Sequence, residues 1–256
     1  MEFTVAGMVH LPPLPGAPGF DGDRDALRAR ALADAETLVA GGVDAVVVEN
    51  FGDAPFYPAS VPKHVVAEMT ALVGAVTDAV DVPVGVNVLR NDAEAAVSVA
   101  AATAADFVRV NVHVGARVTD QGIVEGQAHE TLRLRERLDA DVDILADVDV
   151  KHSAPLADRD LADEARETLE RGRGDALVVS GSGTGVETDH SALERVAPVC
   201  ETLGAPLVVG SGVTPGTVAG YLDVADAVVV GTALKEGREP TNPVDEARVR
   251  ALVDAV

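Results

Sequence analysis

The stretch DILADVD at Asp143–Asp149 opens the unit from which the architecture of this 256-residue chain can be predicted. Apolar and polar residues alternate along it, which predicts a β-strand with one apolar face. A helical pattern follows, in which the inward-facing positions recur every three or four residues until Gly172. Those positions are Leu161, Ala165, Thr168 and Leu169. A strand, a helix and a terminal glycine therefore form one β-α unit.

The same strand-and-helix unit recurs along the whole chain. Short Val-rich runs predict eight strands, at Phe3–Val9, Asp44–Glu49, Pro83–Leu89, Asp106–Asn111, Asp143–Asp149, Asp175–Ser180, Pro206–Gly210 and Asp226–Gly231. Eight strands joined by helical crossovers run parallel and close into a (β/α)₈ barrel. A doubly wound sheet is the alternative, but the first strand runs into a proline-rich segment instead of a G-x-G-x-x-G turn. No low-complexity linker interrupts the pattern, so we expect one domain over residues 1–256.

The composition excludes several classes of protein. With a single cysteine, Cys200, the chain can form no internal disulfide, which favours a reducing cytoplasm. No apolar run is long enough to span a membrane, and we expect no secretory signal at the N-terminus. The 42 Asp and Glu against 20 Lys and Arg give a formal net charge of −22. Such a surface repels nucleic acid and anionic lipid, and it indicates a halophilic cytoplasm in which salt screens the charges.

Polar residues lie on one face of four neighbouring predicted strands, near the carboxyl ends. The outer face of a barrel strand packs against helices, where a charge without a partner is costly. We therefore expect these side chains to point inward at the C-terminal mouth, where ligands bind in this fold. They are Glu49, Asn87, Arg109, Asn111, Asp147 and Asp149. The alternative is a structural network without a ligand role, for example an ion pair between Arg109 and Asp147.

Three glycine-rich turns follow the last three predicted strands and predict a phosphate site. Glycine lets backbone N–H groups approach an anion, and barrels often bind phosphate on the loops after the seventh and eighth strands. The turns are SGSGTG (Ser180–Gly185), GSGVTPG (Gly210–Gly216) and GTALKEG (Gly231–Gly237), and the second has Thr214-Pro215 as a predicted helix start. The phosphate-binding residues that they predict are Ser180, Gly181, Gly183, Thr184, Gly210, Ser211, Gly212, Gly231, Thr232 and Lys235.

Lysines and histidines supply further candidates for chemistry. The chain has three lysines, Lys63, Lys151 and Lys235, and all follow predicted strand ends. Lys151 could neutralise substrate charge, polarise a carbonyl or form a Schiff base, whereas chance exposure is a reasonable alternative for Lys63. His10 and His152 immediately follow predicted strands, which makes them the best acid–base candidates.

The sequence leaves a divalent cation open as a cofactor. It contains no H-E-x-x-H or paired-cysteine pattern for zinc. Glu49, Asp147 and Asp149 could nevertheless hold a hard ion such as Mg²⁺ through oxygen ligands. Without a metal, Glu49 or Asp147 would act as the general base, and Lys151 or Arg109 would stabilise an enolate or oxyanion.

Nine blocks that run nearly end to end make the chain resemble the BtpA family, also described as SgcQ-like. The blocks are Met8–Phe20, Val48–Phe56, Gly85–Ala96, Arg109–Ala116, Thr119–Ala128, Ala146–His152, Val179–Gly185, Val209–Thr214 and Val230–Lys235. The resemblance implies a barrel of the phosphate-binding group, with indoleglycerol-phosphate synthase, the tryptophan synthase α subunit and ribulose-phosphate epimerase. It implies no single reaction, because the family is named for a link to photosystem I biogenesis while other relatives are assigned to sugar utilisation.

Two hypotheses about function follow. The first is an enzyme acting on a phosphorylated sugar or related metabolite by isomerase, epimerase or aldolase-type chemistry. Its reacting end would lie at Glu49, Asn87, Arg109, Asn111, Asp147, Lys151 and His152. The second is a non-catalytic assembly factor that senses a phosphorylated ligand or docks a partner through His10–Phe20 and Val48–Pro58. A ring of inward-facing acids favours the enzyme. In either case we expect a phosphorylated small-molecule ligand and allow for homo-oligomers.

Overall fold

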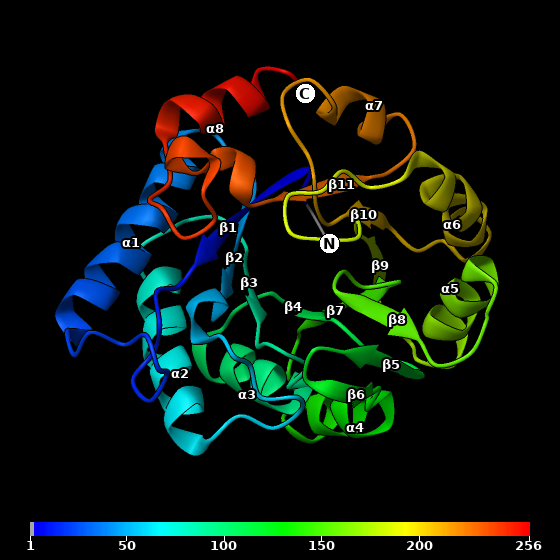
Figure 1. Cartoon of the computed structure of the whole chain (residues 1–256), viewed down its shortest axis with the longest axis horizontal. Helices are drawn as coiled ribbons and strands as arrows, with labels where there is room; N and C mark the ends of the chain where they lie inside the picture. The colour runs from blue at the N-terminus through cyan, green and yellow to red at the C-terminus, as the bar shows by residue number, and fades with distance from the viewer. Residues whose placement is uncertain (1–2) are drawn as a thin grey trace.

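The computed structural model describes residues 3–256, and in them eight parallel strands close into a barrel surrounded by helices (Figure 1). Around the barrel the order is β1 (Val5–His10), β11 (Ala227–Val230), β10 (Leu207–Val209), β9 (Ala176–Val179), β7 (Asp143–Val148), β4 (Phe107–Val110), β3 (Val84–Asn87) and β2 (Ala45–Glu49). Seven of these strands lie within their predicted ranges, and β1 extends one residue further, to His10. The predicted (β/α)₈ fold is confirmed.

Helices follow the barrel strands and cover their outer face (Figure 1). They are α1 (Arg24–Ala40), α2 (Lys63–Thr77), α3 (Ala93–Thr103), α4 (Ala128–Arg137), α5 (Leu161–Glu170), α6 (His190–Leu203), α7 (Val218–Leu222) and α8 (Glu246–Val253), with 3₁₀ turns η1 (Phe51–Asp53), η2 (Thr232–Leu234) and η3 (Glu236–Arg238). Aspartate caps the start of five α-helices by accepting backbone N–H groups. Thr214-Pro215 does not start a helix, because these residues form a turn before α7. No helix in the described part of the chain is long and apolar enough to cross a bilayer.

The alternation of the strands produces two hydrophobic layers. Val46 and Val48 belong to the layer between strands and helices, whereas Val47 belongs to the smaller layer that fills the barrel. Gly85 makes room inside the barrel, since a Cβ there would lie 2.1 Å from the ring of Phe107. Apolar side chains thus fill the interior below the mouth, and polar side chains occupy the carboxyl ends of the strands.

A small antiparallel sheet beside the mouth was not predicted. It contains β5 (Ala116–Thr119), β6 (Gly122–Glu125) and β8 (Ser153–Pro155), in the order β6-β5-β8 (Figure 1). Arg117 on β5 donates hydrogen bonds to Ser153 and to the carboxylates of Asp149 and Glu164. Because Asp149 and Ser153 flank the connection between β7 and β8, Arg117 holds that connection, which carries Lys151, against the sheet.

Candidate functional site

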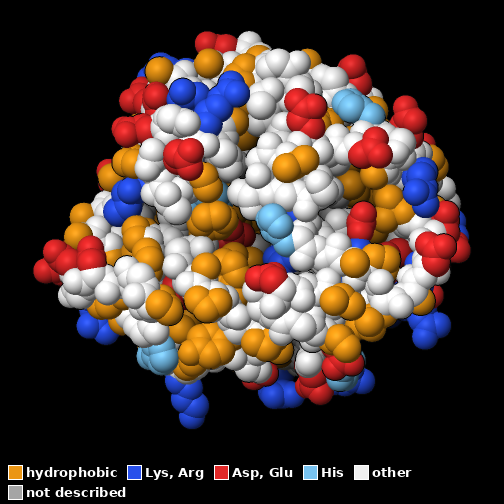
Figure 2. All heavy atoms as spheres, in the orientation of Figure 1, with side chains coloured by type: hydrophobic (Ala, Val, Ile, Leu, Met, Phe, Trp, Pro, Cys, Tyr) orange, Lys and Arg blue, Asp and Glu red, His pale blue; other side chains and the backbone are white. Residues whose placement is uncertain are grey.

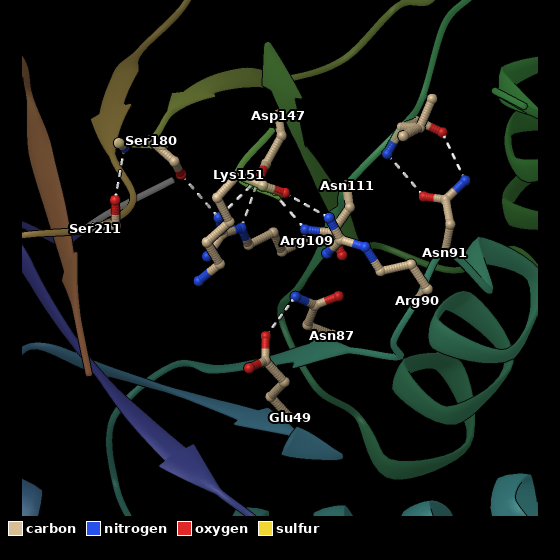
Figure 3. Close-up of polar contacts among 12 residues, drawn as sticks. Glu49, Asn87, Arg90, Asn91, Arg109, Asn111, Asp147, Lys151, Ser180 and Ser211 are labelled. Atoms are coloured by element: carbon tan, nitrogen blue, oxygen red, sulfur yellow. Dashed lines mark hydrogen bonds and ion pairs between the residues drawn. The ribbon is translucent and has the colours of Figure 1, made fainter. Parts of the chain in front are cut away.

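Three of the polar residues at the mouth lie at matched positions on adjacent strands. His10 on β1 is in register with Glu49 on β2, which is in register with Asn87 on β3. All three side chains are buried. The Asn87 amide donates to one carboxylate oxygen of Glu49 at 2.7 Å (Figure 3), and the other oxygen lies 3.8 Å from Nε2 of His10. Glu49 therefore keeps one oxygen available to a ligand.

On the neighbouring strands, Arg109 and Asp147 form a buried bidentate ion pair. Nε and Nη2 of Arg109 each donate to a different oxygen of Asp147 at 2.8 Å, and Asn111 donates to the same carboxylate at 3.3 Å (Figure 3). Burial works against the charge on Arg109, yet the Asp147 carboxylate holds the pKa of Arg109 above its usual value. Arg109 and Asp147 thus form a structural ion pair, which was the alternative to a role in ligand binding. Because both oxygens of Asp147 are engaged, Glu49 is the better placed general base.

Lys151 projects into the mouth from the connection after β7 (Figure 3). Burial lowers the pKa of its ammonium, and the nearby charges of Arg109 and Arg90 act in the same direction, while Glu49 and Asp147 oppose them. A lowered pKa increases the fraction of neutral amine at a given pH. Lys151 can therefore release its proton or act as a nucleophile more readily than a solvated lysine.

Arg90 is a mouth residue that the sequence argument missed. It lies just beyond β3, is buried, and donates through Nη2 to the backbone carbonyl of Lys151 at 2.6 Å. Alternation predicts inward side chains only within a strand, and Arg90 lies past the end of that pattern. The sequence does place Arg90 in a polar run directly after a predicted strand, and that position could have identified it as a mouth residue. Together Arg90, Arg109 and Lys151 outnumber Glu49 and Asp147, so the deep mouth favours an anion although the whole chain is acidic.

His10 has a single tautomer in this environment. Its Nδ1 lies 2.8 Å from the carbonyl oxygen of Pro240 and must donate to it, because a carbonyl only accepts. Burial, assisted by the positive charge of Lys235, lowers the pKa of His10 to about 3. The ring is therefore neutral at physiological pH, and Nε2 is an acceptor. Nε2 faces the carboxylate of Glu49, so a ligand hydroxyl between them would donate to one of these two acceptors.

A cavity of about 90 Å³ lies between the turns that follow β9, β10 and β11. Six of the ten predicted phosphate-binding residues line it: Thr184, Gly210, Ser211, Gly212, Gly231 and Thr232. The lining also includes Lys151, Arg109 and His10, and it gains Gly185, Thr214, Ala233 and Arg238, which were not predicted. Gly212 is required by the backbone itself, because its φ is +70° and a Cβ would lie 2.2 Å from Cα of Glu187.

Four predicted phosphate-binding residues lie outside this lining. Ser180 accepts a hydrogen bond from Arg109, and the N–H of Gly181 donates to Ser211 Oγ at 2.7 Å, so both brace the turns. Gly183 lies in the same turn, beside His152. The prediction for Lys235 is wrong, because this side chain is wholly buried.

Lys235 forms a structural ion pair instead. Its Nζ lies 3.2 Å from Asp34 of α1, and burial lowers its pKa to about 8. The chain leaves β11 through η2, which turns position 235 away from the mouth and toward α1. The exposed Arg238, three residues later, lines the cavity in its place and adds a cation that a phosphate there could reach.

Asp149 also departs from its predicted position. Strand β7 ends at Val148, and Asp149 has a φ of +56°, so the alternation of the strand stops before it. Its carboxylate is 56% exposed and pairs with Arg117 outside the mouth. Asp149 therefore does not join Glu49 and Asp147 in the expected ligand set. Within residues 3–256 no group of three or more His, Cys, Asp or Glu side chains is placed to hold a metal ion.

A larger cavity of about 370 Å³ adjoins the first. Glu49, Arg90, Asp120, Lys151, His152 and Thr184 give it a polar side, and Phe51, Ala54, Phe56 and Leu89 give it an apolar side. His152 is exposed, and its Nε2 accepts the N–H of Thr184 at 3.2 Å. Partial burial, with the charges of Lys151 and Arg90, lowers its pKa. Lys151 and Thr184 line both cavities, so one ligand can occupy the two.

Comparison with known proteins places this geometry in context. A model of the BtpA family matches residues 1–256. The chain is 42% identical over 252 residues to photosystem I biogenesis protein BtpA of Synechocystis sp., covering 98% of this chain and 87% of that protein. It is 46% identical over 253 residues to an uncharacterized protein of Thermococcus kodakarensis (98% and 94% covered), and 34% identical over 259 residues to protein SgcQ of Escherichia coli (100% and 94% covered).

Solved structures share the fold at low identity. Phosphoribosyl anthranilate isomerase from Thermus thermophilus superposes with a TM-score of 0.59 at 13% identity, covering 98% of this chain and 97% of that one. Thiamine phosphate pyrophosphorylase from Pyrococcus furiosus gives a TM-score of 0.61 at 16% identity, covering 99% and 95%. At these identities the likeness concerns the barrel alone.

Proposed function

The chain belongs to the BtpA family, and we propose that it is an enzyme acting on a phosphorylated sugar or a related small metabolite. One observation carries the proposal: Lys151 and Thr184 line both the glycine-bounded cavity and the larger chamber. A phosphate in the first cavity, near Thr232 and Arg238, would place the rest of its ester beside Glu49 in the second. The first cavity would then bind the phosphate, and the second would hold the reacting part of the same ligand.

The groups in the chamber favour proton transfer next to a carbonyl. Glu49 would take a proton from the carbon beside the carbonyl, and Lys151 would stabilise the oxyanion of the resulting enolate. Return of the proton to another atom or to the other face gives isomerisation or epimerisation. Nε2 of His10 would accept a hydrogen bond from a substrate hydroxyl. An aldolase-type variant would instead use neutral Lys151 to form a Schiff base with the carbonyl, releasing water.

The phosphate site is tested first by thermal unfolding in high KCl against phosphorylated metabolites, each with and without Mg²⁺. A ligand at about 100 times its dissociation constant stabilises the native state by about 2.7 kcal/mol. Thr232→Asp puts a carboxylate in the cavity and is expected to abolish the stabilisation by like-charge repulsion. Thr202→Asp, at an exposed position of α6, is the matched control. If no phosphorylated compound stabilises the wild-type protein, the phosphate site is refuted.

The chemistry is tested with any ligand that passes this screen. Glu49→Gln keeps the hydrogen-bond geometry but cannot take a proton, so turnover should fall by about 10²–10⁴-fold while binding is retained. Borohydride reduction during turnover separates the two routes. A covalent adduct at Lys151 identifies the Schiff-base route, and turnover without an adduct identifies acid–base isomerisation. Unchanged turnover in Glu49→Gln would exclude Glu49 as the base.

A second candidate function is favoured by the name of one relative, photosystem I biogenesis protein BtpA. As an assembly factor the protein would dock a partner through the segments 10–20 and 48–58. These segments are partly packed: Leu11 and Leu14 are buried, and the N–H of Leu14 donates to Asp53 at 2.7 Å. A host strain lacking the gene separates the candidates. Full rescue by Glu49→Gln would support the assembly factor and contradict the enzyme.

A further inference from the structure

We propose that the apolar side of the larger chamber, formed by Phe51, Ala54, Phe56 and Leu89, binds an apolar ring of the ligand. The substrate would then be a phosphate ester that carries a planar, apolar group, and not a simple sugar phosphate. The inference rests on the proposed function, because it places the phosphate in the adjoining cavity. It adds the chemical class of the ligand's other end. We call these four residues the apolar wall.

The composition makes the apolar wall unusual. The chain has five Phe, two Tyr and no Trp in 256 residues. Two of the five phenylalanines, Phe51 and Phe56, lie five positions apart in one loop and line one cavity. Figure 2 shows hydrophobic side chains gathered on this face over the segment that follows β2, while acidic side chains lie mainly toward the periphery. A chain that uses aromatic residues so sparingly places two of them in a single candidate site.

Packing of the hydrophobic core does not account for these rings. Phe51 and Phe56 are half-buried, and neither belongs to the core clusters or to the partly buried side chains packed against them within residues 3–256. Phe51 stacks on the buried ring of His10, with centroids 4.3 Å apart and planes 13° apart. His10 is held by Pro240, so Phe51 is presented to the chamber on a fixed support. A preorganised aromatic surface suits stacking with a planar group.

The two sides of the chamber specify an amphipathic ligand. Glu49, Arg90 and Lys151 line the same chamber as the apolar wall. The chamber holds about 370 Å³ against about 90 Å³ for the glycine-bounded cavity, so the bulk of the ligand belongs to the chamber. A small, hydroxylated chain would leave the apolar wall in contact with water. A ring with polar substituents on one edge would satisfy both sides.

The test is isothermal titration in high KCl with inorganic phosphate, ribose 5-phosphate and phenylalkyl phosphates of increasing linker length. We expect one phenylalkyl phosphate to bind at least about tenfold more tightly than ribose 5-phosphate. Phe56→Ala should remove this preference and leave the affinity for inorganic phosphate unchanged. Ala54→Trp, which fills the chamber without removing packing, should do the same. Tyr57→Ala is the matched control, since Tyr57 is an exposed aromatic residue of the same loop outside the cavity lining.

The outcomes separate this inference from the proposed function. The inference is refuted if ribose 5-phosphate binds as tightly as every phenylalkyl phosphate and if Phe56→Ala and Ala54→Trp change neither affinity. The phosphate site would be unaffected by that result. If neither inorganic phosphate nor any ester binds, the proposed function fails and the inference fails with it. Loss of phenylalkyl binding in Tyr57→Ala as well would assign the effect to the loop and overturn the role of the apolar wall.

Discussion

Buried charges of this barrel fall into two groups that look alike in sequence. Arg109 with Asp147 and Lys235 with Asp34 are closed pairs, in which each charge is matched by its partner. Glu49 lines the chamber, and among residues 3–256 no group donates a hydrogen bond to its second oxygen. Removing one member of a closed pair leaves a buried charge and destabilises the fold, so such a variant says little about chemistry. Glu49 is therefore the more informative position for substitution.

His10 provides a prediction of pH dependence. The pKa of His10 is about 3 in the folded protein, against 6.5 for a solvated histidine, so the unfolded chain takes up the proton first as the pH falls. The resulting stability is present above pH 6.5 and is lost as the pH drops toward 3. Between pH 7 and pH 5 His10 should account for a loss of about 2 kcal/mol in the free energy of unfolding.

Urea unfolding of His10→Asn at the two pH values measures this loss. The Asn amide can still donate to the Pro240 carbonyl but does not titrate. The decrease in stability from pH 7 to pH 5 should therefore be smaller by about 2 kcal/mol in the variant than in the wild type. His129→Asn, at an exposed position, serves as the control. An identical decrease in His10→Asn and the wild type would show that His10 is not held neutral.

At the scale of elements, the small sheet β6-β5-β8 positions the connection that carries Lys151. Arg117 is its main link, because it bonds Asp149 and Ser153 at the two ends of this connection and Glu164 in α5. Arg117→Gln should loosen the sheet without disturbing the barrel, whose strands are joined by their own parallel ladder. Hydrogen exchange should rise in 116–125 and 149–155 and stay unchanged in β1 and β2.

The functional consequence of this variant follows from the same contacts. Ligand affinity should fall together with the protection of 149–155, because Lys151 lies in that segment. Arg166→Gln, an exposed arginine of α5, is the matched control. If exchange in 149–155 is unchanged in Arg117→Gln, the small sheet does not hold the connection.

At the scale of the whole molecule, we expect the net charge of −22 to dominate the solution behaviour. Repulsion among exposed acids opposes the compact state, and salt screens it: the screening length falls from about 10 Å at 0.1 M to about 3 Å at 1 M. We expect the unfolding midpoint to rise steeply with KCl over that range. The triple variant Asp158→Asn, Glu170→Gln and Asp254→Asn, at exposed positions, should show a shallower rise. A midpoint that does not change with KCl would contradict a salt-dependent fold.

The amino-acid sequence was sufficient to predict the barrel and, for four neighbouring strands, the face that lines it. Alternation of apolar residues is a local property, and the requirement that parallel strands bury both faces leaves few ways to assemble eight β-α units. The inward direction of Glu49, Asn87, Arg109 and Asp147 follows from that alternation alone. The glycine-rich turns were identified for the same reason, because each directly follows a strand.

The partners of the charged side chains were decided only by the tertiary structure. Lys235 pairs with Asp34 across 201 positions, a distance that no local pattern spans. Asp149 leaves the mouth because one left-handed residue ends the alternation of β7. Arg90 and the apolar wall lie on connections past the strand ends, where the backbone has no fixed period. Local periodicity therefore determined the scaffold, whereas closure of the barrel determined which side chains meet in the site.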